Sequence, residues 1–360
     1  MNERLSKKIS IYNFIFTIGI VLYHCKTFNT LYSAKPLAFF DAAYELYDLV
    51  GYICMGFFFM ISAYLFYLGL TTEKSVYKKM QKRLLTLGVP FLAWNVIHLL
   101  WEIFYGVVKG NLRLGFWDFI WGFTFQPFDG PLWYMFALLL LMPIAPVLYK
   151  LKDHSKVFLG VVIGLFICCN LGKLFMTSDD AVTQWAARFV GYLPIYFLGA
   201  YFGLCKSEFV SNEAYSYKLV APIAAGLSLL IIAYFAFLKQ EIPLLNNVLY
   251  FVLPITVWLS TYNAMYDKIS IGYPLKITFF VYAMHKLLIE LLYMSMTKTI
   301  GFTSLPPIIS FFAHFVVVAA VYFICLATAY IAGKILPSKM YFALSGGRVE
   351  GGRAKKQKTS

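Results

Sequence analysis

The sequence predicts an all-α, polytopic membrane protein, a bundle of about ten transmembrane helices with both termini in the cytoplasm. Of its 360 residues, 61% are hydrophobic and only 13% are charged. A soluble domain is nearer one quarter charged and one half apolar. The 35 Phe, 27 Tyr and 7 Trp residues fit a bundle with aromatic side chains at its membrane interfaces. The remaining support comes from the lengths of the apolar runs and from the charges between them.

The apolar runs between polar breaks are each close to the roughly 20 residues that cross the hydrocarbon core. They cover residues 9–28, 49–70, 84–108, 131–150, 157–176, 188–205, 219–238, 244–263, 275–297 and 306–335. The last run is long enough to tilt or to extend past the membrane. No internal repeat divides the chain, so residues 1–340 are expected to form one transmembrane domain. Residues 341–360 are basic and are expected to form a disordered cytoplasmic tail.

The first apolar run resembles a signal peptide only in part. Lys7 and Lys8 precede it, but no small-residue cleavage site follows. The tetrad Leu22–Cys25 is a poor lipoprotein signal because Tyr23 and His24 are bulky. A retained first helix is therefore predicted.

Positive charge alternates along the chain and orients the predicted helices. Basic residues gather before the first run, between the second and third, after the fourth and at the C-terminus. With ten spans these segments share one side of the membrane, which the positive-inside rule assigns to the cytoplasm. A net charge of +14 can also indicate nucleic acid binding. Here the basic residues flank membrane spans, so we expect membrane lipids as partners, no nucleic acid, and a multi-pass protein of the cell membrane.

The six cysteines show no paired spacing typical of a metal site or a disulfide framework. All lie in or beside apolar runs, where Cys behaves as a small core residue. His98 and Glu102 are one helical turn apart, a spacing that suits a metal ion or a proton relay. No third ligand accompanies them, so no metal site is predicted.

His24 is the most informative polar residue, because ionisable groups inside membrane spans are costly and usually functional. Asn13 lies eleven residues earlier, about three helical turns, so both side chains share one helix face roughly 16 Å apart. They cannot touch, but they can line one channel. Histidine is well suited to moving a proton near neutral pH. The alternative is an interfacial histidine bonded to a neighbour.

A basic cluster of Lys78, Lys79, Lys82 and Arg83 lies at the start of the third run. Such a cluster suits a phosphorylated ligand, to which Arg offers paired hydrogen bonds. Membrane topology alone also explains it. In the ninth run, His285, Lys286 and Glu290 make an unusually polar span, in which Lys286 can extend toward an interface.

Five local patterns, in order, carry a resemblance. They are Ile20–His24, Gly56–Tyr64 with its Phe-rich stretch, Lys82–Pro90 followed by Trp94 and Asn95, Gly130–Tyr134, and Phe279–His285. Together they resemble the membrane acyltransferase-3 family, whose members O-acylate cell-surface carbohydrates. The resemblance runs from about Tyr12 to the tenth span.

The chain departs from the family pattern at three positions. Asn13 stands where the family commonly has Arg, and Asn can form hydrogen bonds but carries no charge. Ala63 replaces a Gly after Ser62, and Lys286 stands where Pro often follows the last His. These departures bear on substrate fit more than on fold.

The resemblance implies an integral membrane acyltransferase that moves an acyl group, usually acetyl from acetyl-CoA, to a hydroxyl of a cell-surface or lipid-linked sugar. Our hypothesis is that His24 acts as general base, that Asn13 contacts the donor or fixes the helix environment, and that Arg83, helped by Lys82 and Lys79, holds the CoA phosphates. Ser62, Trp133, Tyr134 and His285 are candidates for acceptor binding or for polarising the carbonyl. The alternative is a multi-pass transporter or flippase of a polysaccharide precursor, although no inverted repeat is evident. A structural scaffold would leave His24 and the ordered motifs without a purpose.

Overall fold

The computed structural model describes residues 3–25, 38–110, 114–176, 178, 180–211, 217–238, 242–299 and 307–349. These residues form helices and no strand, which confirms the all-α prediction. Within these ranges, eight helical segments are long and apolar enough to cross a membrane. They are Glu3–His24, Leu46–Tyr67, Glu73–Lys109, Gly130–Asp153, Ser155–Lys173, Val182–Cys205, Leu219–Leu238 and Phe315–Ile335.

The other two predicted runs correspond to helices that differ from these eight. Helix α12 (Pro243–Leu259) is shorter, at 17 residues, and helix α14 (Thr278–Thr299) carries Lys286 and Glu290. A polytopic helical membrane protein is therefore confirmed. The cytoplasmic placement of the termini stays a prediction.

Contacts divide the chain into two compact units, which we describe separately. The first comprises Met1–Asn13, Leu37–Met80 and Leu140–Ser270, and the second comprises Phe14–Pro36, Gln81–Leu139 and Ile271–Ser360. Helices α1 (Glu3–His24) and α3 (Glu73–Arg83) each run from the first unit into the second.

The first unit is built around close packing of α2 (Ala38–Tyr67) on α9 (Ala181–Cys205). A Cβ atom added at Gly203 would lie 2.7 Å from the Tyr64 carbonyl oxygen and 3.0 Å from the Tyr67 Cβ. One added at Gly199 would overlap the Met60 carbonyl and lie 3.0 Å from the Ala63 Cβ. Small residues at such a contact let helix backbones approach closely without a hydrophobic driving force from water.

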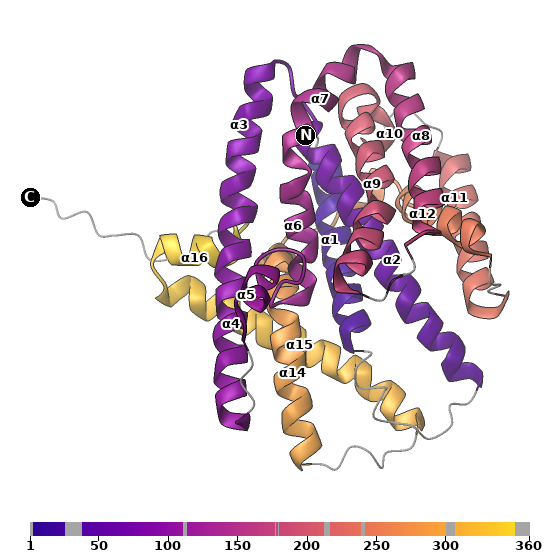
Figure 1. Cartoon of the computed structure of the whole chain (residues 1–360). Helices are drawn as coiled ribbons and strands as arrows, with labels where there is room; N and C mark the ends of the chain where they lie inside the picture. The colour runs from indigo at the N-terminus through magenta and orange to yellow at the C-terminus, as the bar shows by residue number, and fades with distance from the viewer. Residues whose placement is uncertain are drawn as a thin grey trace, which may run out of the picture. The chain divides into compact units, whose positions relative to one another are not determined.

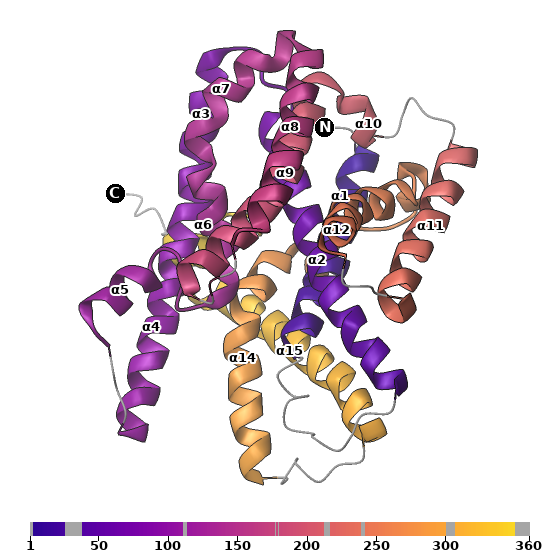
Figure 2. The same ribbon diagram turned by 45° about the vertical axis from the view of Figure 1, so that its right-hand side comes forward.

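Two further pairs of helices pack against each other in the first unit. Helix α8 (Ser155–Lys173) packs along α9, and α11 (Tyr217–Ala233) packs on α12, as Figure 2 shows. The shorter elements are η4 (Met142–Ile144), α7 (Ala145–Lys150), η5 (Leu151–Asp153), α10 (Ser207–Ser211), η6 (Tyr234–Leu238) and η7 (Asn263–Tyr266). The buried Lys8 amino group donates to the Trp258 and Thr261 carbonyl oxygens, both at 2.8 Å, so this polar group is satisfied inside the unit.

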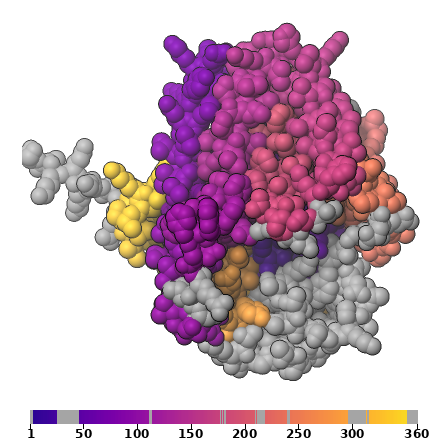
Figure 3. Space-filling model, viewed as in Figure 1, coloured from indigo at the N-terminus to yellow at the C-terminus, as the bar shows by residue number. Residues whose placement is uncertain are grey.

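The second unit consists of helices around α14. They are η2 (Leu84–Gly88), α4 (Val89–Lys109), α5 (Phe116–Gly122), η3 (Gly130–Leu132), α6 (Trp133–Leu140), α13 (Tyr273–Lys276), α15 (Pro307–Ile335) and α16 (Ser338–Ser345). Helix α14 packs against α15 (Figure 1), and α16 packs against α4 at the surface of the unit (yellow in Figure 3). Trp94 of α4 fixes this last contact by donating from its indole nitrogen to the Leu344 carbonyl oxygen at 3.0 Å.

The structure differs from the sequence prediction in local detail. Helices α3, η2 and α4 form one helical segment, Glu73–Lys109, so the helix begins well before the predicted run and includes the whole basic cluster. The run predicted at 131–150 is broken into shorter helices near its prolines, which cannot donate backbone hydrogen bonds. Of the tail expected from residue 341, residues 341–345 belong to α16, and Tyr341 is buried there.

Candidate active site

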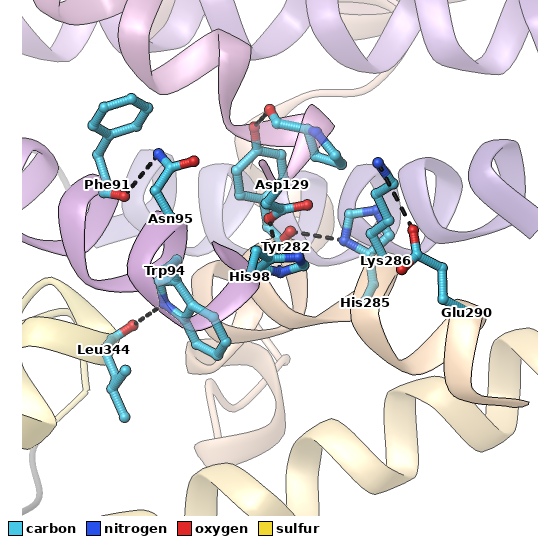
Figure 4. Close-up of polar contacts among 11 residues, drawn as sticks. Phe91, Trp94, Asn95, His98, Asp129, Tyr282, His285, Lys286, Glu290 and Leu344 are labelled. Carbon is cyan, nitrogen blue, oxygen red and sulfur yellow. Dashed lines mark hydrogen bonds and ion pairs between the residues drawn. The ribbon is translucent and has the colours of Figure 1, made fainter. Parts of the chain in front are cut away.

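Ionisable side chains of the second unit gather around α14, and Figure 4 draws His98, Asp129, His285, Lys286 and Glu290 among them. They come from the end of α1, from α4, from the segment before η3 and from α14 itself. The members are His24, His98, Asp129, His285, Lys286 and Glu290. This group of ionisable side chains within one helical unit is the candidate site.

The structure brings His24 and His285 together. Their ring centroids are 5.0 Å apart and their ring planes are inclined by 46°. His24 is the last residue of α1 and is partly exposed, whereas His285 is completely buried. Of the two histidines, His24 is therefore the more accessible to a substrate, and His285 packs beside it in the protein interior.

A hydrogen bond fixes the tautomer of His285. Its Nδ1 lies 2.7 Å from the Tyr282 carbonyl oxygen, which can only accept, so Nδ1 carries the proton. The Nε2 atom is buried and has no hydrogen-bond partner among the described residues. In the neutral ring this atom holds a lone pair, so His285 can accept a hydrogen bond from a group that enters the site.

Asp129 is the most deeply buried carboxylate of this group. One of its oxygens faces His98 Nε2 at 3.5 Å, and both side chains are nearly inaccessible to solvent. The next residues form η3, where the Tyr282 hydroxyl donates to the Pro131 carbonyl oxygen. These two contacts join the segment before α6 to α4 on one side and to α14 on the other.

Lys286 and Glu290 continue the polar surface along α14. They form an ion pair of 3.9 Å, one helical turn apart. A Cβ atom at Gly130 would lie 3.1 Å from the Lys286 amino nitrogen, so the glycine leaves room for this side chain. No group of three or more His, Cys, Asp or Glu side chains in the described ranges is arranged to hold a metal ion.

The basic residues expected at a donor site divide between the units. Arg83 and Lys82 lie in the second unit, at the end of α3, with Lys82 exposed and Arg83 partly buried. Lys79 lies in the first unit, where its amino group donates to the carbonyl oxygens of Leu68 at 2.6 Å and Phe66 at 2.9 Å. These carbonyls end α2, so Lys79 also satisfies a helix C-terminus.

The remaining predicted site residues are also divided. Asn13 and Ser62 are partly buried in the first unit, on α1 and α2. Trp133 and Tyr134 begin α6 in the second unit, and the Tyr134 ring lies 6.2 Å from the ring of Tyr282. The single helix α1 contains both Asn13 and His24, which keeps the two on one face as the spacing predicted.

Sequence reasoning did not identify Asp129 and Tyr282 as members of this site. Asp129 directly precedes the Gly130–Tyr134 motif, and Tyr282 lies three residues before His285. These positions are weak signals, because a carboxylate between apolar runs is ordinarily a loop residue. The burial of Asp129 against His98 appears only in three dimensions.

An all-helical, multi-pass membrane protein with paired histidines inside one helical unit is the class that this fold and site define. The model of the acyltransferase domain that characterises the acyltransferase 3 family matches residues 14–329. The chain therefore belongs to this family and is a membrane acyltransferase. Comparison with curated proteins and with solved structures found no match.

Proposed function

We propose that the protein transfers an acetyl group from acetyl-CoA to a hydroxyl of a cell-surface sugar or of its lipid-linked precursor. The observation that carries this proposal is the pair of His24 and His285 rings, 5.0 Å apart, with the Nε2 atom of His285 unpartnered among the described residues. An acyl transfer to a hydroxyl needs a base beside the acceptor oxygen, and histidine is the usual one.

In the proposed reaction His24 takes the proton from the acceptor hydroxyl as its oxygen attacks the thioester carbonyl. The new C–O bond forms, the C–S bond breaks, and the CoA sulfur leaves and receives the proton from His24. Base catalysis of this kind accelerates a reaction by about 10²–10⁴-fold. His285 offers a hydrogen-bond acceptor behind His24, which orients its ring and stabilises the imidazolium that forms during transfer.

The donor is proposed to bind through Arg83 and Lys82, because guanidinium and ammonium groups hold phosphates by charge-assisted hydrogen bonds. Trp133 and Tyr134 of the second unit are proposed to contact the acceptor, since aromatic faces suit sugar rings. The roles expected of Lys79, Asn13 and Ser62, which lie in the first unit, stay predictions.

The experiment is transfer of radiolabelled acetyl from acetyl-CoA by the purified protein, with surface polysaccharide from deletion cells as the acceptor. Incorporation that mild alkali releases, matched by ester groups missing from the polysaccharide of deletion cells, supports the proposal. Labelled acceptor that resists alkali, or no labelling at all, argues against it. Movement of a lipid-linked sugar across liposomes without any acyl donor would favour a flippase instead.

A further inference from the structure

We infer that Arg348, which follows α16, joins Arg83 to form a two-arginine phosphate site for the acyl-CoA donor. This inference rests on the proposed donor and adds a residue beyond residue 329, where the family match ends. All the groups that carry it belong to the second unit.

The Arg348 guanidinium contacts two neighbouring elements of the second unit. One of its nitrogens donates to the Thr86 carbonyl oxygen at 3.4 Å, and Thr86 lies three residues after Arg83 in the same helical segment. The guanidinium carbon also lies 3.9 Å from the centroid of the Phe279 ring, at the start of α14. A guanidinium stacked on an aromatic face is held in a defined orientation.

The turn before Arg348 fixes the direction in which the chain leaves α16. Gly346 and Gly347 adopt φ angles of 63° and 69°, which favour glycine. A Cβ atom at Gly346 would overlap the Arg348 guanidinium and lie 2.7 Å from the Thr86 carbonyl oxygen. Together with the hydrogen bond from Trp94 to Leu344, these glycines hold the end of α16 against α4.

Arg348 and Arg83 interact electrostatically. Crowding of protein around the guanidinium and the nearby Arg83 cation lower the pKa of Arg348 to about 10, so it remains charged at neutral pH. The Arg348 residue is exposed to solvent, and the Arg83 cation repels its guanidinium group. Within the described ranges no carboxylate oxygen lies within 4.0 Å of Arg348. An anion that bridges the two guanidinium groups would turn this repulsion into attraction.

Aromatic rings on α14 connect Arg348 to His285. The Phe279 ring that carries Arg348 lies 6.4 Å from the Tyr282 ring, and the Tyr282 ring lies 6.2 Å from the His285 ring. Phe279 and His285 are separated by six residues of α14, about 9 Å of helix rise. If the CoA phosphate binds at the two arginines, the rest of the CoA molecule can therefore lie along the rings of Phe279 and Tyr282, which lead to the proposed reaction centre.

The test measures the dissociation constants of CoA and of 3′-dephospho-CoA for the purified full-length protein by calorimetry. Arg348→Gln is expected to weaken CoA binding roughly 10- to 100-fold, the loss of a charge-assisted hydrogen bond. Lys339→Gln, which removes an exposed cation from α16, is the matched control and should bind as the wild type does. The double variant Arg83→Gln/Arg348→Gln should lose less than the product of the single effects, because both arginines hold one group.

The outcomes separate this inference from the proposed function. Wild-type affinity in Arg348→Gln, with weakened binding in Arg83→Gln, overturns the role of Arg348 and leaves the acetyl-CoA donor in place. Equal losses in Arg348→Gln and Lys339→Gln also overturn it, since any positive charge then suffices. If the wild type itself does not bind CoA, the donor proposal fails and the inference fails with it. Arg348→Lys is a second variant, expected to keep more affinity than Arg348→Gln.

Discussion

The contact between Asp129 and His98 leads to a quantitative prediction about stability. The facing atoms are 3.5 Å apart, and neither Asp129 oxygen nor His98 Nε2 has a hydrogen-bond partner in the described part of the chain, so the contact is electrostatic. Asp129→Asn keeps the size of the side chain but removes the group that can ionise. Removing one of two buried polar groups that face each other leaves the other without its neighbour, at a cost of about 1–3 kcal/mol. We therefore expect Asp129→Asn and His98→Gln each to lower the free energy of unfolding by that amount.

A double-mutant cycle isolates the contact from other effects. Unfolding of the wild type, Asp129→Asn, His98→Gln and the double variant is followed by circular dichroism during titration with a denaturing detergent. Coupling of about 1 kcal/mol or more between the two substitutions is expected for groups in direct contact. Additivity within about 0.5 kcal/mol would refute the reasoning, because residues that do not interact behave in that way. Asp153→Asn, at an exposed carboxylate in η5, is a control expected to change little.

Two further predictions concern the first unit. Gly203→Leu should lower the thermal unfolding temperature in detergent, because its side chain would meet the Tyr64 carbonyl and Tyr67 across the contact between α2 and α9, at a cost of about 1–3 kcal/mol or more. Gly160→Leu is the control, because no neighbour lies within 4 Å of the added Cβ. An equal decrease in the unfolding temperature of both variants would contradict close packing at Gly203. Asp180 caps α9 through the backbone nitrogens of Val182 and Thr183, and hydrogen bonds from Ser178 and Thr183 lower its pKa below the usual value. Its carboxylate therefore stabilises the fold above the unfolded pKa of about 3.9, and this contribution is lost as the pH falls below that value. Asp180→Ala should unfold at a lower temperature than the wild type at pH 7, and this difference in unfolding temperature should become smaller below pH 4. A difference in unfolding temperature that does not change with pH would exclude the carboxylate as its cause.

The sequence was sufficient to predict the fold class, because long apolar runs and the distribution of positive charge follow from the cost of exposing polar groups to lipid. It also predicted that His24 and Asn13 share one helix, since the three-turn spacing depends only on helix geometry. The break in the helix at η4, which contains Pro143, was not predicted. Hydropathy is averaged over about 20 residues, so it does not detect a break in a helix where the residues at the break are themselves apolar.

The candidate site was only partly accessible to sequence reasoning. His24 and His285 were both singled out, but their proximity depends on tertiary packing between residues 261 positions apart along the chain. Asp129 and Arg348 were not selected, because one lies between apolar runs and the other in a segment expected to be a disordered tail. Asp129 stands out only because it is buried, which the sequence does not show. The position of Arg348 depends on the turn that the two preceding glycines form.

The central claim is that His24 is the base of an acyl transfer, and one comparison tests it most directly. Purified wild type and His24→Gln are compared for acetyl transfer to the acceptor and, in the same preparations, for the dissociation constant of acetyl-CoA. The account predicts that transfer falls by about 10²–10⁴-fold while donor binding is unchanged. Unimpaired transfer by His24→Gln, with the protein folded and the donor bound, would contradict it.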